Sequence, residues 1–528
     1  MALHERPLLG KGRRYSDSIY PFLMIWIHWF DIYCIGIMKA AVSRIICCLK
    51  CLLLVLCGIP CIRSKSYLAG LLRYPLGPCS RSHRQRHKRS LFTLWLLLLP
   101  ASISQQKMSN IFSLSSQSLK LTTAEDIEPH LKPLIASDTV TEIHLGGNTL
   151  GAPACEALGA VLKSKTTLQV AKLDDIFTSR LLSEIPPALS SLLTSLLVLP
   201  NLHTVDLCDN AFGLNTQAPL VHFLSKHVAL RHLILQNNGL GPHAGALVAD
   251  ALTALAERKE EARRQGREVP DLETVVCGRN RLESGSMAAW AKAYRAHGRV
   301  RTVKMVQNGI HQDGMAMLLR EGLKGCERLE VLDLQDNTFT ITGARALSEV
   351  VGGWKRLREC GISDSLLGSR GARQVVELLG KGENRELEVL RLQYNDVDAR
   401  GVKALLEATR SGLPKLRRVE LNGNKFSEDD EHVEGLRVLL DERREEAGKS
   451  AVEEEWGLDE LDELESEDED EDKEVEGSGD EEAEEEEEME ERREGVLKDA
   501  DREEESKVSQ KKDEDVDELA DALGKTEL

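Results

Sequence analysis

Two groups in this sequence that could bind a reacting group through hydrogen bonds are the amide of Asn237 and the guanidinium group of Arg180. Asn237 stands directly before a second asparagine in the string QNNGLGP, and Arg180 ends the string DDIFTSR. An amide donates and accepts hydrogen bonds, and a guanidinium group binds carboxylates or phosphates through a planar set of donors. Neither group is a nucleophile, so both can only steady a reacting group that another molecule supplies.

The motifs of a self-contained active site are missing from the sequence. It contains no Gly-x-Ser-x-Gly, no His-Glu-x-x-His and no Walker loop. Among the cysteines clustered between positions 47 and 61, Cys48 and Cys51 have Cys-x-x-Cys spacing, but neither a second such pair nor a histidine at finger distance follows, so no metal site is expected. We therefore predict that the chain is not an enzyme in its own right and carries no cofactor, and that any catalysis belongs to a partner.

The candidate groups lie within a repeat that fills residues 108–450. Eight segments follow the pattern L-x-x-x-x-L-x-x-N, with other apolar residues replacing some leucines, and two more keep the register without the asparagine. Successive ninth places are mostly 28 to 30 residues apart. Two spacings are longer, at 34 and 42 residues. Such a period is typical of leucine-rich repeats. The ninth places hold Asn148, Ile176, Asn210, Asn238, Asn280, Asn308, Asn337, Ser365, Asn395 and Asn424.

Each repeat has room for one short strand and one helix. The strand supplies the alternating leucines, and the asparagine amide binds the backbone of the following turn. Because helices are wider than strands, stacked repeats should curve into a horseshoe lined by a parallel sheet. Residues 118–135 are expected to cap the N-terminal end, and a polar helix within 426–446 the other end. The predicted fold class is α/β: a ribonuclease-inhibitor-like horseshoe of about eleven repeats.

Two positions depart from the repeat in informative ways. Asn238 takes the structural ninth place of its repeat, so the amide of Asn237 is expected to point outward from the loop between strand and helix. Ile176 replaces the asparagine of its repeat, so the loop from Asp174 to Arg180 needs another source of order.

Charge divides the chain of 528 residues, whose net charge is −19, into three parts. Residues 1–107 hold 16 basic and 3 acidic side chains, 108–450 hold 43 and 45, and 451–528 hold 9 and 39. The overall negative charge argues against nucleic-acid binding. Residues 451–528 are too acidic and too poor in apolar side chains to fold, so we predict a disordered acidic tail that either solvates the protein or captures a basic partner.

The first 107 residues have neither repeat pattern nor helix caps. The apolar stretch 19–38 is long enough to span a bilayer but contains His28 and Asp31 near its middle. We interpret 1–107 as an atypical basic and hydrophobic extension, either an artefact of the gene model or a dispensable addition, with a membrane anchor as the alternative. Membrane binding is not expected unless this segment is made.

Several strings between the repeated residues resemble the RanGAP family, the fungal GTPase-activating proteins for Ran. They are DDIFTSR (174–180), DNAFG (209–213), LSKH (224–227), NNGLGP (237–242), VKMVQNGI (303–310), LDLQDNTFT (332–340) and LRLQYN (390–395). The resemblance covers roughly residues 113–430 and continues in kind into the acidic tail. It implies a GTPase activator whose partner, Ran-GTP, carries the nucleotide and Mg²⁺, with a Ran-binding protein as a further partner and a cytoplasmic or perinuclear location.

The resemblance also implies roles for the two chemical groups. Activators typically raise the slow intrinsic hydrolysis of a small GTPase by about 10³ to 10⁵. This family steadies the GTPase's own catalytic glutamine with an asparagine, which matches Asn237, and does not insert an arginine finger. Arg180 matches the family's essential arginine, with Ser179 replacing a glycine, and is expected to order its loop or to pair with acidic groups of Ran.

A further set of polar residues on the same loops is expected to contact the partner, the alternative being a solvated face. The set consists of Asp174, Asp175, Asp209, Asn210, Arg279, Arg281, Lys304, Gln307 and Asp336. Two other functions stay open at this point. An acidic leucine-rich scaffold or histone chaperone would have no effect on GTP turnover, and a ribonuclease-inhibitor-like binder would use its concave face.

Overall fold

The computed structural model describes residues 110–448, 452, 455–464, 492 and 495. These residues belong to the second of two compact units, Ser104–Leu528. The predictions for residues 1–107, their cysteines and the greater part of the acidic tail therefore lie outside the described residues.

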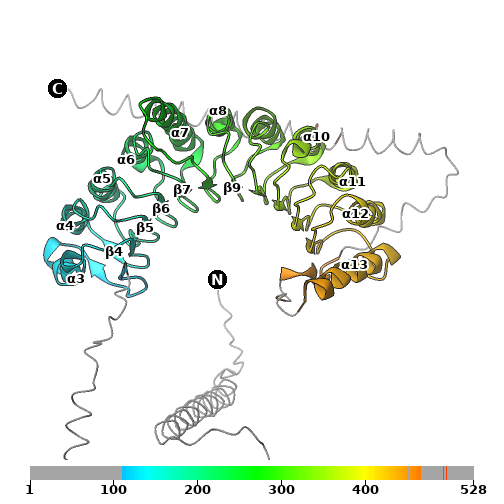
Figure 1. The fold of residues 1–528 in the computed structure, drawn as a ribbon, viewed down its shortest axis with the longest axis horizontal. Coiled ribbons are helices and arrows are strands. Elements are labelled where there is room, and N and C mark those ends of the chain that lie inside the picture. Colours follow the sequence, from blue (N-terminus) through cyan, green and yellow to red (C-terminus); the bar gives the residue numbers. More distant parts are fainter. Residues whose placement is uncertain (1–109, 449–451, 453–454, 465–491, 493–494, 496–528) are drawn as a thin grey trace, which may run out of the picture. The chain divides into compact units, whose positions relative to one another are not determined.

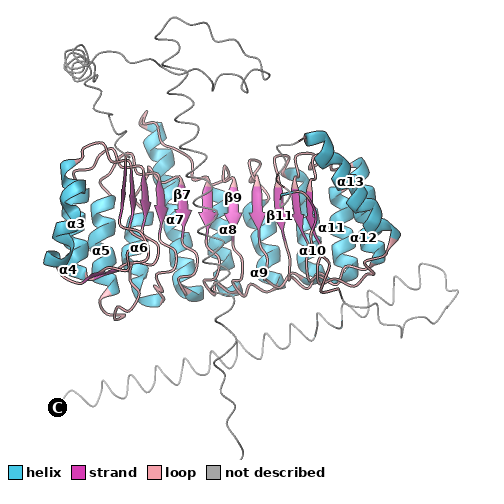
Figure 2. Ribbon diagram, turned by 90° about the horizontal axis from the view of Figure 1, so that it is seen from below, coloured by secondary structure: helices cyan, strands magenta, loops and turns pink. Residues whose placement is uncertain are grey.

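A parallel sheet of twelve short strands forms the inner face of the array, with neighbouring strands in chain order (Figures 1 and 2). The middle residue of a typical strand is buried between two half-exposed neighbours, as for Leu233, which pairs in register with Val205 and Val275. The strands are β1 (Ile111–Ser113), β3 (Glu142–His144), β5 (Val170–Lys172), β6 (Thr204–Asp206), β7 (His232–Ile234), β8 (Thr274–Val276), β9 (Thr302–Lys304), β10 (Val331–Asp333), β11 (Glu359–Gly361), β12 (Val389–Arg391), β13 (Arg418–Glu420) and β14 (Gly457–Leu458).

Helices lie side by side along the outer face of this sheet (Figure 1). They are α3 (Ala124–Ala136), α4 (Ala152–Leu162), α5 (Ile185–Leu196), α6 (Gln217–Leu224), α7 (Gly241–Arg264), α8 (Met287–Ala296), α9 (Gln312–Met317), α10 (Thr340–Val350), α11 (Gly368–Leu379), α12 (Ala399–Ser411) and α13 (Glu431–Ala447). A π-helical segment, Leu318–Leu323, continues α9. The leucines of strands and helices form one continuous core. The leucine-rich repeat horseshoe predicted from the sequence is confirmed.

The repeated asparagines form a ladder of buried amides between neighbouring repeats. In Asn238, which is fully buried, Nδ2 donates to the carbonyl oxygens of Leu207 and Leu235, and Oδ1 accepts the backbone N–H of Asn210. Asn210 repeats this arrangement one repeat earlier, where its Oδ1 accepts the N–H of Ile176 at 2.9 Å. Each amide thus satisfies backbone groups that would otherwise be buried without partners.

Both ends of the array differ from the sequence prediction. The N-terminal cap begins earlier than expected, because β1 at Ile111–Ser113 pairs with β3. Lys120–Leu121 forms a second strand, β2, which pairs with β4 (Thr149–Leu150) in a separate two-stranded sheet. At the other end, the tail prediction is wrong for residues 455–464, where β14 extends the sheet along β13 and Leu461 is buried.

The two long spacings are accommodated in different ways. The 42-residue spacing lengthens α7 to 24 residues. The 34-residue spacing instead adds loop residues between Phe177 and the start of α5 at Ile185.

Candidate functional site

The loops that leave the C-terminal ends of the strands carry a regular row of polar side chains. In eight consecutive repeats the residue at the eighth place, directly before the ladder position, has a left-handed φ between 46° and 58°. Each of these residues donates its backbone N–H to a carbonyl oxygen of the next repeat at 2.8–3.0 Å. We call this set the rim row: Asp175, Asp209, Asn237, Arg279, Gln307, Asp336, Asp364 and Tyr394.

The left-handed backbone explains how the rim row is presented. Asparagine and aspartate tolerate this conformation, whereas arginine, glutamine and tyrosine adopt it at a cost of about 1–2 kcal/mol. The ladder hydrogen bonds on both sides hold the loop in this conformation. The side chains of Asp209, Asn237, Arg279 and Gln307 are consequently exposed beside a buried ladder.

Asn237 lies in the row next to Asp209 of the preceding repeat. Its Nδ2 donates to Asp209 Oδ1 at 2.7 Å, and both side chains are exposed. The amide is therefore outside the ladder and at the surface, as expected, but it is held by a neighbouring carboxylate that the sequence analysis did not pair with it. Within the described residues, Oδ1 of Asn237 accepts no hydrogen bond and remains available to a partner.

Arg180 is the residue that orders the loop lacking a ladder asparagine. Its Nε donates to Thr149 Oγ1, and its Nη2 donates to Thr122 Oγ1 and to the carbonyl oxygen of Thr149, each at 3.0 Å. Phe177 of the same loop forms an isolated bridge with Thr149 and packs against Phe212. The half-buried guanidinium group thus ties the 177–184 loop to the two-stranded sheet near the N-terminal cap.

The remaining candidates divide between the rim, the concave face and the interior. Arg279 and Arg281 are exposed on one loop, and Gln307 lies on the next. Lys304 is not on a loop, contrary to the prediction: it ends β9 and, since Val303 beside it is buried, lies on the concave face. Asn210 is wrongly predicted to contact a partner, because it is 2% exposed and its amide is bound within the ladder.

Acidic groups dominate both ends of the rim row. Asp174 and Asp175 are half-buried near Arg180, and the carboxylate of Asp175 accepts a hydrogen bond from Thr178. At the other end, burial and the neighbouring Asp364 raise the pKa of Asp336, against a smaller opposing effect from Gln307 and Arg279.

Sequence reasoning missed Asp364 and Tyr394. Asp364 is less obvious because it precedes Ser365 rather than an asparagine. Both residues nevertheless hold the eighth place of their repeats, so taking the eighth place of every repeat would have found them. A depression of about 470 Å³ lies on this part of the rim, lined among others by Arg281, Gln307, Asp336 and Leu366. Leu366 is 52% exposed, so the depression offers an apolar contact between charged groups.

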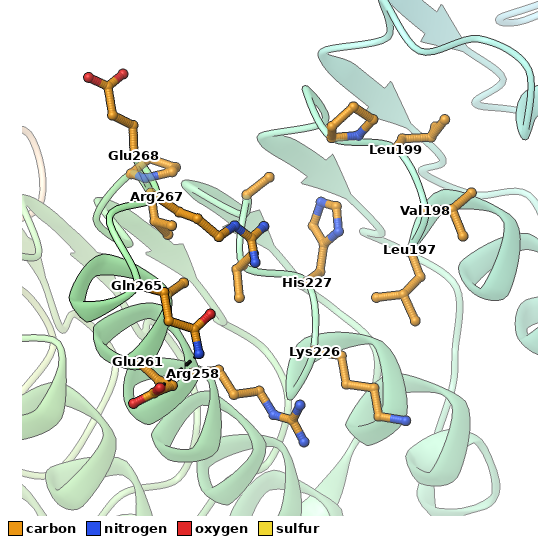
Figure 3. A pocket seen from close by; sticks show the side chains of 16 residues that line it. Leu197, Val198, Leu199, Lys226, His227, Arg258, Glu261, Gln265, Arg267 and Glu268 are labelled. Carbon is orange, nitrogen blue, oxygen red and sulfur yellow. Dashed lines mark hydrogen bonds between the residues drawn. The ribbon is translucent and has the colours of Figure 1, made fainter.

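A second cavity, of about 520 Å³, is lined by side chains that include His227, Arg258 and Arg267 (Figure 3). It is lined by segments that end helices and lead into strands, 197–200, 226–229 and 265–270, so the rim row is on the other side of the array. Lys259 is buried beside it and donates to the carbonyl oxygens of Val228, Leu230 and Pro270 at 2.7–2.8 Å. These bonds fix the loops of the lengthened α7 repeat.

Two further searches cover only the described residues. They contain no group of three histidine, cysteine or acidic side chains arranged to hold a metal ion. Among the same residues, no helix is both long and apolar enough to cross a membrane.

Fold and site together define a leucine-rich repeat protein that presents one rim of polar side chains. A family model described as leucine-rich repeat matches residues 325–348 and 383–406. The chain is 38% identical over 348 residues to Ran GTPase-activating protein 1 of Saccharomyces cerevisiae, covering 64% of this chain and 84% of that protein. It is 32% identical over 320 residues to the Ran GTPase-activating protein of Drosophila melanogaster, covering 60% and 52%. The chain belongs to the Ran GTPase-activating protein family.

Proposed function

We propose that this chain is a GTPase-activating protein for Ran and that it accelerates hydrolysis of the GTP bound to Ran. The proposal is supported by the names of its relatives and by the extent of the match, which takes in most of the yeast protein. The partner supplies the nucleotide and Mg²⁺, and this chain supplies side chains that organise the partner's active site. No cofactor of its own takes part.

The observation that carries the proposal is the exposed, fixed amide of Asn237. Hydrolysis by a small GTPase is slow when its glutamine and the attacking water are poorly oriented. An amide held rigidly at the surface can hydrogen-bond that glutamine and lower the entropy cost of reaching the reactive geometry. Oδ1 of Asn237 is the acceptor available for this purpose.

Arg180 is not the finger that neutralises the phosphates in this proposal. Its Nε and Nη2 already bind Thr122 and Thr149, so reaching a nucleotide would break three hydrogen bonds. We assign Arg180 the role of holding the 174–184 loop in the shape that faces the partner. Catalysis then depends on orienting the glutamine of Ran, without an arginine finger.

The rim around Asn237 is the proposed contact surface for Ran-GTP. It includes Asp174 and Asp175 on one side and Arg279, Arg281, Gln307 and Asp336 on the other, with Lys304 on the adjoining concave face. Charges of both signs on this surface favour one orientation of the partner, and they contribute more to specificity than to affinity. A Ran-binding protein is a further proposed partner. The proposed site of action is the cytoplasm, where hydrolysis would release transport complexes built on Ran-GTP.

Single-turnover hydrolysis tests the proposal. Ran loaded with radiolabelled GTP is mixed with the full chain at one hundredth of its concentration, and phosphate release is followed over time. We expect acceleration by at least about 10³. A small GTPase of another family serves as the control and should be unaffected. Unchanged phosphate release from Ran would refute the proposal and leave the scaffold or chaperone alternative, which predicts binding without turnover.

A further inference from the structure

Asp209 and Asn237 form a rigid polar pair at the surface of the rim. The distance from Asn237 Nδ2 to Asp209 Oδ1 is 2.7 Å. Both residues have left-handed backbones, with φ of 58° and 56°. Their backbone N–H groups are bound to the carbonyl oxygens of Gln236 and Gly278 at 3.0 and 2.9 Å. The backbone hydrogen bonds therefore fix the main chain of both residues, and the hydrogen bond between the side chains fixes the positions of their polar atoms.

The chemistry of the pair decides which end of the amide faces outward. An ionised carboxylate accepts hydrogen bonds and cannot donate them, so only the NH₂ end of the amide can face Asp209. The carbonyl oxygen of Asn237 must then point away from Asp209. Without the carboxylate the last torsion of asparagine is broad and roughly two-fold, and both orientations become accessible.

We infer that Asp209 is a positioning residue that orients the amide of Asn237 with its carbonyl oxygen toward the partner. This inference rests on the proposed function. In that orientation Asn237 accepts a hydrogen bond from the amide N–H of the partner's glutamine. The carbonyl oxygen of that glutamine then remains directed at the attacking water. If the amide of Asn237 were turned by half a rotation, its NH₂ group would face the partner. It would then donate to the glutamine's carbonyl oxygen and turn that oxygen away from the attacking water.

The pair contributes little to folding, so its loss should appear in catalysis. Both side chains are exposed, and a hydrogen bond at the surface adds little net stability. Asp209→Asn keeps the shape of the side chain and tolerates the left-handed backbone, but it can donate as well as accept. We expect a tenfold fall in kcat for GTP hydrolysis on Ran, a KM within twofold of wild type, and an unchanged melting temperature.

An exchange of the two residues gives a second, independent variant. Asn237→Asp alone places two carboxylates face to face, and we expect kcat to fall at least 100-fold. In the double variant Asp209→Asn/Asn237→Asp, the amide at position 209 donates to the carboxylate at 237, whose second oxygen faces outward as an acceptor. We expect kcat to recover about tenfold relative to Asn237→Asp. Asp250→Asn, at an exposed position of α7 whose carboxylate lies 4.0 Å from Lys292 of α8, is the matched control and should behave as wild type.

The experiment is a titration of each full-length variant against Ran-GTP, giving kcat and KM separately, with a thermal melt of each protein. The inference is supported by a loss of kcat in Asp209→Asn together with recovery in the double variant. It is overturned if Asp209→Asn keeps the wild-type kcat, if the loss lies in KM alone, or if the double variant recovers nothing. A wild-type chain that does not accelerate hydrolysis overturns the proposed function instead.

Discussion

Two adjacent asparagines, Asn237 and Asn238, should respond to substitution in opposite ways. Asn238→Ala removes a fully buried amide that serves Leu207, Leu235 and Asn210. The two leucine carbonyl oxygens keep second donors in the amides of Asn210 and Asn280, so only the N–H of Asn210 is left without a partner. One orphaned N–H costs about 1–3 kcal/mol and each of the two lost bonds to the leucine carbonyl oxygens about 0.5–1.5 kcal/mol, which gives roughly 2–6 kcal/mol.

Asn237→Gly removes only an exposed hydrogen bond to Asp209. Glycine adopts the left-handed backbone of this position without strain, so it is a cleaner substitution than alanine, which adds about 1–2 kcal/mol. We expect a stability loss of about 1 kcal/mol. The rate of hydrolysis on Ran should fall at least about 100-fold, since a fixed group that acts in the transition state contributes on that scale.

Chemical denaturation and stopped-flow phosphate release, measured on the same protein preparations, separate the two effects. Asn238→Ala should unfold early yet retain near wild-type kcat in its folded fraction. Asn237→Gly should unfold almost normally and be nearly inactive. If Asn237→Gly proves unstable and its folded fraction is fully active, Asn237 is structural and the site assignment fails.

Four further predictions concern other parts of the array. Arg180→Lys loses the planar set of donors to Thr122 and Thr149, so limited proteolysis should cut the 177–184 loop faster than in wild type; an unchanged cleavage rate would contradict its ordering role. Arg279→Ala should raise KM for Ran-GTP while kcat stays within tenfold, whereas a loss of about 10³ in kcat would identify an arginine finger. Asp336→Asn should raise the melting temperature at pH 7, because burial and the neighbouring Asp364 raise the pKa of Asp336 and make its ionised form unfavourable in the folded state. The gain should shrink as the pH falls through the raised pKa. It should vanish well below the ordinary aspartate pKa of about 3.9, where Asp336 is protonated in both states, and a gain that persists there would exclude this cause. Removal of residues 465–528 should weaken Ran binding at low salt more than at high salt and leave kcat unchanged, and an equal loss at both salt concentrations would exclude an electrostatic role for the tail.

The repeat itself could be predicted because its signal is local and redundant. Eight asparagines at one spacing specify the turn, and the leucines around them specify strand and helix. The structure bears out both roles, since the asparagine amides lie buried between repeats and the leucines fill the core. Within the repeat, even a missing asparagine correctly indicated that the loop before Arg180 needed other contacts.

The partners of exposed side chains could not be predicted in the same way. Arg180 binds Thr122 and Thr149, which are 58 and 31 residues away, and Asn237 binds Asp209 from the previous repeat. These pairings depend on how the repeats stack. The orientation of the rim row also depends on a left-handed backbone, which residue type does not indicate at Arg279 or Gln307. Lys304 is a different case: it holds the fifth place of its repeat, beside the buried Val303, so the pattern itself indicates a strand and the loop prediction for Lys304 is wrong.

Composition alone places the boundary of the acidic tail too early, because it averages over short apolar segments. Within residues 455–464, Trp456 lies 5.7 Å from the guanidinium group of Arg417, and Asp459 accepts hydrogen bonds from the backbone of Leu421 and Asn422. An exposed edge strand, β13, favours the addition of such a segment. The carboxylates here are part of the folded array, and Glu463 contacts Tyr394 of the rim row.

The central claim, that this chain acts through the glutamine of its partner, is tested most directly with Ran in which that glutamine is replaced by leucine. Binding of the full chain to this variant and to wild-type Ran, both loaded with GTP, is compared with the hydrolysis rate of each. We predict binding of similar strength and acceleration of wild-type Ran alone. Substantial acceleration of the leucine variant would contradict the claim, because Asn237 would then have no glutamine to orient.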